Sequence, residues 1–230
     1  MRIVEESGRA DDIARVYVAE LADGRLVECA EAVQPPVPRE RKWVLIVSTL
    51  AGCPIRCPFC DAGGDYRGPL AAGDILDQVD LLVRSRFPEG GPLPAVMKVQ
   101  FARMGDPAFN DAVIDALKQL PEHLPGARVV ASVSTVAPAG RERFFEGIAD
   151  VKDALYADGR FQMQFSIHTT CETARRRLVP ARTWTFARMA EWGRAFRKDG
   201  DRKVTLNFAP VAGLPQIGRA SCRERVYHPV

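Results

Sequence analysis

The sequence predicts an α/β fold in which a parallel β-sheet is covered by helices and preceded by a small N-terminal β-hairpin. Two observations indicate the sheet: five β-prone runs occur within residues 43–209, and they alternate with amphipathic helical stripes. Such alternation is typical of parallel strands joined by crossover helices. A third observation indicates the hairpin, because Asp23-Gly24 separates two short β-prone runs.

The N-terminal hairpin is predicted over residues 15–30. A proline-rich stretch at 35–38 follows it and is typical of a linker. We therefore expect a first unit over residues 1–40 and a main domain over residues 41–216.

The main domain is predicted to contain five strands, at 43–49, 95–101, 127–134, 161–167 and 203–209. Apolar residues at helical spacing predict helices around 75–83, 113–120, 144–155 and 186–196. Asn110 and Thr183 are the expected N-caps of the second and fourth helices. We interpret the four apolar stripes as faces packed on the core rather than as cofactor sites.

The composition is ordinary for a globular protein, with 47% hydrophobic and 27% charged residues. No apolar run approaches the ~20 residues of a membrane span, and the N-terminus lacks a signal-peptide pattern. We therefore expect a cytoplasmic protein without a membrane partner. The net charge of +3 is too small to indicate nucleic acid by itself. Six cysteines, three of them in one loop, indicate a metal or cluster site in a reducing compartment.

The most informative segment is the loop Cys53-Pro54-Ile55-Arg56-Cys57-Pro58-Phe59-Cys60, which comes soon after the first strand of the main domain. Three thiolates at this spacing can bind three irons of a 4Fe–4S cluster and leave the fourth iron open to a small molecule. Because active sites of parallel α/β barrels lie at the carboxyl ends of the strands, the loop is expected at the functional edge.

Two alternatives use the same cysteines for another purpose. Structural zinc would take Cys57 and Cys60 as one half of a site and His168 with Cys171 as the other half. A non-catalytic iron–sulfur electron carrier would usually supply a fourth cysteine nearby, and Cys29 and Cys171 are isolated.

The cysteine spacing, with Phe59 before the third cysteine, resembles the signature of the radical S-adenosylmethionine (SAM) superfamily. A closer resemblance, to the radical-SAM adenine-C2 methyltransferases of ribosomal and transfer RNA, runs from about residue 12 to Gln216. It rests on an ordered set of segments: 21–28, 48–53, Met104-Gly105-Asp106-Pro107, Val133-Ser134-Thr135, Ser166-Ile167-His168 and Leu178-Val179-Pro180. The resemblance implies a partial (β/α) barrel of radical-SAM type, since members commonly have six β–α units and five are visible here.

The resemblance also implies roles for individual residues. Cys53, Cys57 and Cys60 would bind the 4Fe–4S cluster, with SAM on the open iron and a low-potential electron donor of flavodoxin or ferredoxin type. Glu28 would occupy the position of the family's proposed proton acceptor, and its alternative interpretation is an exposed hairpin carboxylate. Contacts to SAM are implied for six residues at strand ends: Gly105, Asp106, Ser134, Ser166, Ile167 and His168.

The chain departs from the family pattern at three positions. Ile46 lies seven residues before the first cluster cysteine, where the family has a second catalytic cysteine, and it cannot form a thiol-linked intermediate. Asp61 follows Cys60 where the family has serine or alanine. Asp106 replaces the longer glutamate of the family's Gly-Glu-Pro segment.

A basic group, Arg175, Arg176, Arg177 and Arg182, is interpreted either as phosphate contacts for a structured RNA or as a solvated helix face. The resemblance implies an RNA adenine as substrate. A radical SAM enzyme acting on a non-RNA substrate is the alternative within the same superfamily, since fold does not determine substrate.

The last residues, 217–230, do not resemble the family. Residues 217–226 back-translate to a DNA string that resembles a widely used short-read sequencing adapter. We therefore expect the native sequence to end near Gln216, with a non-native tail and a truncated barrel.

Overall fold

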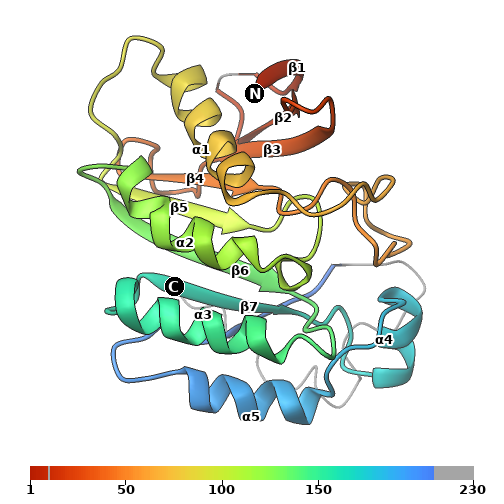
Figure 1. Ribbon diagram of the computed structural model, residues 1–230. Coiled ribbons are helices and arrows are strands. Elements are labelled where there is room, and N and C mark those ends of the chain that lie inside the picture. The colour runs from red at the N-terminus through yellow and green to blue at the C-terminus, as the bar shows by residue number, and fades with distance from the viewer. Residues whose placement is uncertain (10, 210–230) are drawn as a thin grey trace.

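The computed structural model describes residues 1–9 and 11–209, which form one eight-stranded sheet with helices against it (Figure 1). The strands follow one another across the sheet in chain order, from β1 at one edge to β8 at the other. The elements are β1 (Arg2–Ser7), β2 (Ala14–Glu20), β3 (Leu26–Ala32), β4 (Lys42–Val47), α1 (Ala72–Arg86), β5 (Val96–Phe101), η1 (Pro107–Phe109), α2 (Ala112–His123), β6 (Arg128–Thr135), α3 (Glu142–Leu155), β7 (Phe161–Ser166), α4 (Glu172–Leu178), α5 (Phe186–Phe196) and β8 (Thr205–Asn207).

Strands β4 to β8 are parallel, as the alternation of strand and helix patterns predicted. The apolar stripes of α1, α2, α3 and α5 are buried in one core with the outward side chains of these strands, among them Leu45, Val99, Val133 and Phe165. Within the described residues the sheet does not close, because β1 pairs only with β2 and β8 only with β7. The prediction of an incomplete barrel with helices outside is confirmed.

The N-terminal hairpin is confirmed as β2 and β3. The Gly24 N–H donates to the Leu21 carbonyl oxygen at 3.1 Å, and Asp23 accepts from the Arg25 N–H at 3.0 Å, which closes the turn. β3 also pairs antiparallel with β4, so the hairpin continues the main sheet. β1 was not predicted, because most of its side chains are exposed and its two glutamates obscure any alternation of apolar residues.

Two of the expected helix caps lie elsewhere in the structure. The α5 cap is Thr185, whose hydroxyl accepts from the Arg188 N–H at 3.2 Å, and the prediction of Thr183 was wrong by two residues. Asn110 lies one residue before the α2 cap position, and its Oδ1 accepts from the Ala112 N–H at 3.0 Å. Helix α4 was not predicted because it is seven residues long and has three consecutive arginines in place of an apolar stripe.

None of the helices in the described part of the chain combines the length and the apolarity that crossing a membrane requires.

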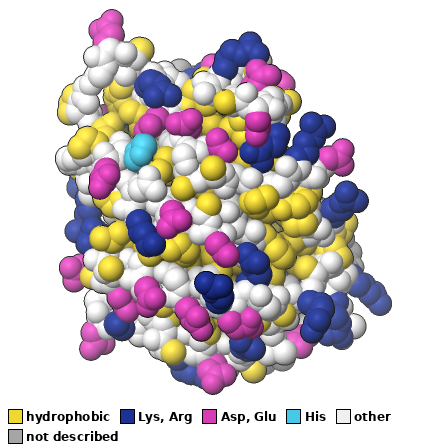
Figure 2. Space-filling view, in the orientation of Figure 1, with side chains coloured by type: hydrophobic (Ala, Val, Ile, Leu, Met, Phe, Trp, Pro, Cys, Tyr) yellow, Lys and Arg dark blue, Asp and Glu magenta, His cyan; other side chains and the backbone are white. Residues whose placement is uncertain are grey.

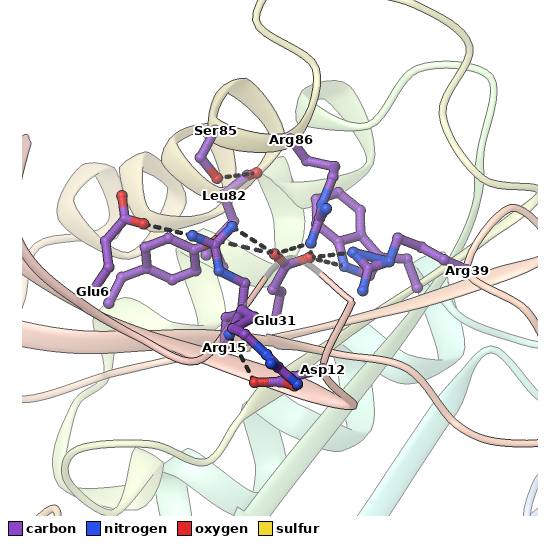
Figure 3. Close-up of polar contacts among 11 residues, drawn as sticks. Glu6, Asp12, Arg15, Glu31, Arg39, Leu82, Ser85 and Arg86 are labelled. Carbon is purple, nitrogen blue, oxygen red and sulfur yellow. Dashed lines mark hydrogen bonds and ion pairs between the residues drawn. The ribbon is translucent and has the colours of Figure 1, made fainter.

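A buried carboxylate, Glu31 of β3, fastens the N-terminal strands to the main sheet and to α1 (Figure 3). It accepts hydrogen bonds from the Tyr17 hydroxyl at 3.0 Å and the Trp43 indole N–H at 2.8 Å. Arg39 lies 3.0 Å from one carboxylate oxygen, and Arg86 lies 2.6 Å from the other. Since the Glu31 side chain is 1% exposed, its charge is stabilised by these donors rather than by water.

A third guanidinium stands beside the same carboxylate. Arg15 lies 3.9 Å from Glu31 and 2.5 Å from Glu6 of β1, so Glu6 supplies a second negative charge to the group. The cluster therefore connects β1, β2, β3 and the last turn of α1.

The Glu31 cluster gives a prediction for stability. Glu31→Gln keeps the shape of the side chain but leaves half-buried guanidiniums without their buried carboxylate, so the free energy of unfolding should fall by about 3 kcal/mol. Urea denaturation measures the change. The control is Glu20→Gln, which breaks the exposed pair with Arg2 and should cost less than about 1 kcal/mol. Equal losses in the two variants would contradict the assignment of Glu31 as a structural charge.

Candidate active site at the carboxyl edge of the sheet

The cysteine loop follows β4 and lies at the edge of the sheet where the parallel strands end (Figure 1). Two hydrogen bonds hold the segment before Cys53 against residues 67–68. The Ala51 N–H donates to the Gly68 carbonyl at 3.0 Å, and the Arg67 N–H donates to the Ala51 carbonyl at 2.7 Å. Gly52 has φ +73°, and a Cβ there would lie 2.2 Å from the Asp65 carbonyl oxygen. Only glycine fits at this position, so the sequence fixes the path of the chain into Cys53.

The three cysteines of the loop influence one another. Cys53 and Cys57 are half-buried and Cys60 is exposed. Burial raises the pKa of the Cys57 thiol to about 12, and the neighbouring thiols of Cys53 and Cys60 add to the shift. In the described part of the chain, no three His, Cys, Asp or Glu side chains are close enough together to bind one metal ion. The loop nevertheless supplies three thiols, the donor type of an iron–sulfur cluster, at the strand ends, and binding of a cluster stays a prediction.

The segment after β5 also fits a cofactor beside this loop. Gly105 has φ +83°, and a Cβ there would lie 2.4 Å from the side chain of Leu50. The N–H groups of Thr49 and Leu50 donate to the Met104 carbonyl at 3.0 and 3.2 Å, so this segment lies directly against the approach to Cys53. The Thr49 hydroxyl is buried without a hydrogen-bond partner in the described residues. An unpaired buried hydroxyl in this place suits a polar ligand.

Asp106 lies at the centre of the edge and is 6% exposed. One carboxylate oxygen accepts from the Ala108 N–H at 2.9 Å and from the Thr135 hydroxyl at 2.7 Å. The other accepts from the Val136 N–H at 2.6 Å. Burial raises the pKa of Asp106, and these donors together with the positive charge of Arg175 oppose the rise. Both oxygens are used within the protein, and the predicted contact of Asp106 with SAM stays a prediction.

The predicted serines come together at the ends of adjacent strands. The hydroxyls of Ser134 and Ser166 lie 3.2 Å apart, and the Asn207 side-chain N–H donates to Ser134 at 2.9 Å. The side chains of Ser134 and Ser166 lie on the face of the sheet opposite the helices, because the preceding residues, Val133 and Phe165, belong to the core and strand side chains alternate between faces. The three residues form a polar group suited to hydroxyl or carboxylate ligands.

Ile167 and His168 leave the end of β7 in different directions. The Ile167 side chain lines an apolar groove with Met189 and Leu206, on the helix side of the sheet. His168 has φ +61°, and its Nδ1 accepts from the Ala209 N–H at 3.1 Å. Its ring packs edge-on against Phe59 of the cysteine loop, with centroids 4.7 Å apart. Burial and, to a smaller extent, Arg175 lower the pKa of His168 to about 4. A neutral ring with Nδ1 as acceptor leaves Nε2–H as its donor.

Glu28 is paired rather than freely solvated. Its carboxylate lies 2.6 Å from Arg103, which in turn lies 3.8 Å from Asp61, the residue after Cys60. The Glu28 N–H points at the Met104 sulfur at 3.1 Å, and the Ser48 hydroxyl donates to the Glu28 carbonyl. β3 is thereby connected to the end of β5 and to the cysteine loop.

Both interpretations of the basic group were wrong for Arg175. Arg175 is 4% exposed, and its guanidinium donates to the Val136 carbonyl at 2.7 Å and the Ser166 carbonyl at 3.2 Å. It is neither a solvated helix residue nor a surface contact. Arg176, Arg177 and Arg182 are exposed.

Sequence reasoning missed two residues of the site, Arg103 and Asn207. Asn207 ends the fifth parallel strand, as Ser134 and Ser166 end the third and fourth, so the same argument from strand ends would have found it. Arg103 had no sequence signal, because its partner Glu28 is 75 residues earlier in the chain and meets it only through the sheet.

The fold and the site define a class, an open parallel α/β barrel with a three-cysteine loop at the carboxyl end of its first parallel strand. A radical SAM methyltransferase of Sphaerobacter thermophilus shares this fold, with a TM-score of 0.71 and 22% identity, over 92% of this chain and 58% of that structure. No family model matches the sequence.

Two relatives identify the family more closely. The "Dual-specificity RNA methyltransferase RlmN" of Halorhodospira halophila is 35% identical over 178 residues, 75% of this chain and 44% of the relative. The "Probable dual-specificity RNA methyltransferase RlmN" of Synechocystis sp. is 29% identical over 217 residues, 92% of this chain and 56% of the relative. The chain belongs to the RlmN-like radical SAM family and spans about half the length of these relatives.

A half-buried lysine lies on the inner face of the barrel, opposite the helices. The side chain of Lys98 of β5 makes no hydrogen bond or ion pair with any residue that the structure describes, and the residue alternates with the core residues Met97 and Val99. Burial lowers its pKa from 10.5 to about 8, and the positive charges of Lys42 and Arg202 add to the effect.

This lysine gives a prediction for pH dependence. Because the folded pKa lies below the unfolded value, unfolding takes up a proton between pH 8 and 10.5, and the half-buried ammonium destabilises the fold at neutral pH. Lys98→Met should therefore raise the free energy of unfolding at pH 7, and its advantage should shrink as pH rises from 8 to 10.5. Urea denaturation of both proteins across this range measures the difference. An advantage that does not change with pH would show that Lys98 has an ordinary pKa.

Proposed function

We propose that this chain is the catalytic part of a radical SAM enzyme that acts on RNA. The observation that carries the proposal is the Cys53, Cys57 and Cys60 loop, which lies at the carboxyl edge of an open parallel barrel. The names of its relatives support RNA as the substrate class and methyl transfer as the reaction class. Residues 1–40 would form an N-terminal unit, and residues 41–216 would form the barrel. Residues 217–230 lie outside the described residues and would be a non-native tail.

The cofactors follow from the cysteine loop. Cys53, Cys57 and Cys60 would hold a 4Fe–4S cluster, and the reduced cluster would supply the electron for reductive cleavage of SAM to a 5′-deoxyadenosyl radical. An external low-potential donor of flavodoxin or ferredoxin type would provide the electron, which favours a cytoplasmic protein. Gly105, where the positive φ and the contact with Leu50 leave no room for a side chain, would present bare backbone to SAM.

The strand ends would orient SAM. Ser134, Ser166 and Asn207 offer hydroxyl and amide groups at one place, suited to the ribose or the carboxylate. His168, held neutral, would offer Nε2–H, and its ring would support Phe59 beside the cluster. Asp106 would act mainly by holding the ends of β5 and β6 together.

Glu28 would act as the proton acceptor near the substrate, held by Arg103. The ion pair at 2.6 Å holds the carboxylate beside the end of β5. Ile46 lies one strand away, in register with Ala30 of β3 and Gln100 of β5. Since Ile46 carries no thiol, the chain would start the radical chemistry with the family's residues but lacks one residue of its thiol-dependent methyl transfer.

The test is anaerobic reconstitution of the chain with iron and sulfide, followed by dithionite and SAM. We expect 5′-deoxyadenosine from the wild type and none from Cys57→Ala, which should also lose the visible absorption of the cluster. The matched control is Cys171→Ala, because Cys171 is an exposed cysteine outside the loop and its loss should leave both signals unchanged.

Two outcomes would decide against the proposal. A cluster that takes up electrons but never cleaves SAM would favour an electron carrier. Loss of metal in both Cys57→Ala and Cys171→Ala, with zinc in place of iron in the wild type, would favour the structural zinc site with His168.

A further inference from the structure

A polar pocket lies between α4 and the segment that precedes α5. Its volume is about 480 Å³, and we call it the α4 pocket. The side chains that matter for its chemistry are Glu172, Arg175, Arg176, Arg182, Thr183 and Thr185. Three arginines and one glutamate give it an excess of positive charge.

The two exposed arginines of the pocket are available to a ligand. The Arg182 guanidinium makes no hydrogen bond or ion pair with a described residue. Arg176 makes one weak contact, 3.3 Å to the Thr173 hydroxyl. Glu172 offsets only part of this charge: it accepts from the N–H of Phe186, the first residue of α5, at 3.2 Å, and its negative charge acts on the buried Arg175.

The wall of the pocket is a built structure rather than a mobile surface. Arg175 is buried, and its guanidinium donates to the Thr183 hydroxyl at 2.5 Å and to backbone carbonyls of β7 and of the segment after β6. Its Nε–H is buried without an acceptor in the described residues. A fixed cation with an unmet donor raises the affinity of the pocket for an anion.

The pocket adjoins the proposed active site. Arg175 bonds to the carbonyl of Ser166, and a small apolar cluster packs Leu178 and Val179, at the end of α4, on Ile55 of the cysteine loop. In Figure 1 α4 lies on the same side as the cysteine loop, and Figure 2 shows Lys and Arg side chains gathered over this part of the face. A chain-like anion bound here would extend directly to the strand ends.

We propose that the α4 pocket binds a backbone phosphate of the RNA substrate, next to the nucleotide that enters the barrel. Arg176 and Arg182 supply the planar guanidinium donors that phosphate oxygens prefer, and Thr183 and Thr185 supply hydroxyls. This inference rests on the proposed function, since it names the part of the protein that holds the substrate.

The experiment measures binding of a fluorescently labelled stem–loop RNA to the chain by anisotropy, across a range of salt concentrations and without SAM. Arg176→Ala/Arg182→Ala should weaken binding by about tenfold and reduce the slope of log Kd against log salt by about 1. The matched control is Arg194→Ala/Arg197→Ala, which removes the same charge from the exposed side of α5 and should leave affinity and slope nearly unchanged. Thermal unfolding checks that all variants are folded.

Equal losses in the two double variants would overturn the inference, because the effect would then be one of net charge. No loss in Arg176→Ala/Arg182→Ala, or no RNA binding by the wild type, would overturn it as well. Cleavage of SAM is scored separately. A wild type that fails to cleave SAM, while only the α4 pocket variant loses RNA affinity, would overturn the proposed enzyme but support the phosphate site.

Discussion

The geometry of the functional edge depends on one buried carboxylate, Asp106. Its three donors come from the end of β6 and from η1, and Asp106 itself lies in the segment after β5, so it ties β5 to β6 at the point where the chain turns away from the sheet. Hydrogen bonds to a charged group contribute about 1.5–3 kcal/mol each, which is enough to hold these ends in one arrangement. Asp106 also lies close enough to Cys53 to influence the pKa of its thiol. Asp106 therefore holds together the strand ends beside the cysteine loop.

A buried cation extends this platform to the next strand. Arg175 donates to carbonyls that follow β6 and end β7, and the negative charge of Asp106 partly offsets the cost of burying it. Burial lowers the pKa of Arg175 to about 10, which leaves the guanidinium charged at neutral pH. The ends of three parallel strands are thus joined by two opposite charges whose partners are mostly backbone groups. Such an edge is organised before any ligand binds, as an active site requires.

The features that the sequence predicted depend on local patterns, and the features that it missed depend on contacts between residues far apart in the sequence. The five parallel strands, the hairpin and four of the five α-helices follow from local periodicity, and the cysteine loop from its spacing. The cap at Thr185, the strand β1 and the short helix α4 carry weak local signals and depend on tertiary contacts. The burial of Arg175 was invisible in a run of arginines, because only the fold shows that carbonyls from two strand ends converge on it. The pairing of Glu28 with Arg103 was missed for the same reason.

Under the proposed function, the thiols that face the barrel interior would constrain the chemistry. Ile46 lies at the position where the resemblance implies a second catalytic cysteine, and it pairs in register with Ala30 and Gln100. Cys29 is near in sequence but cannot replace that cysteine. It lies on the opposite face of β3 from Glu28, is fully buried in the core, and burial raises its pKa to about 12. Glu28, paired with Arg103, is the carboxylate two residues along β3 from Ala30, the register partner of Ile46. Under the proposed function, the described site would support cleavage of SAM and proton transfer, and it would offer no thiol at the position of Ile46 to accept or release a methyl group.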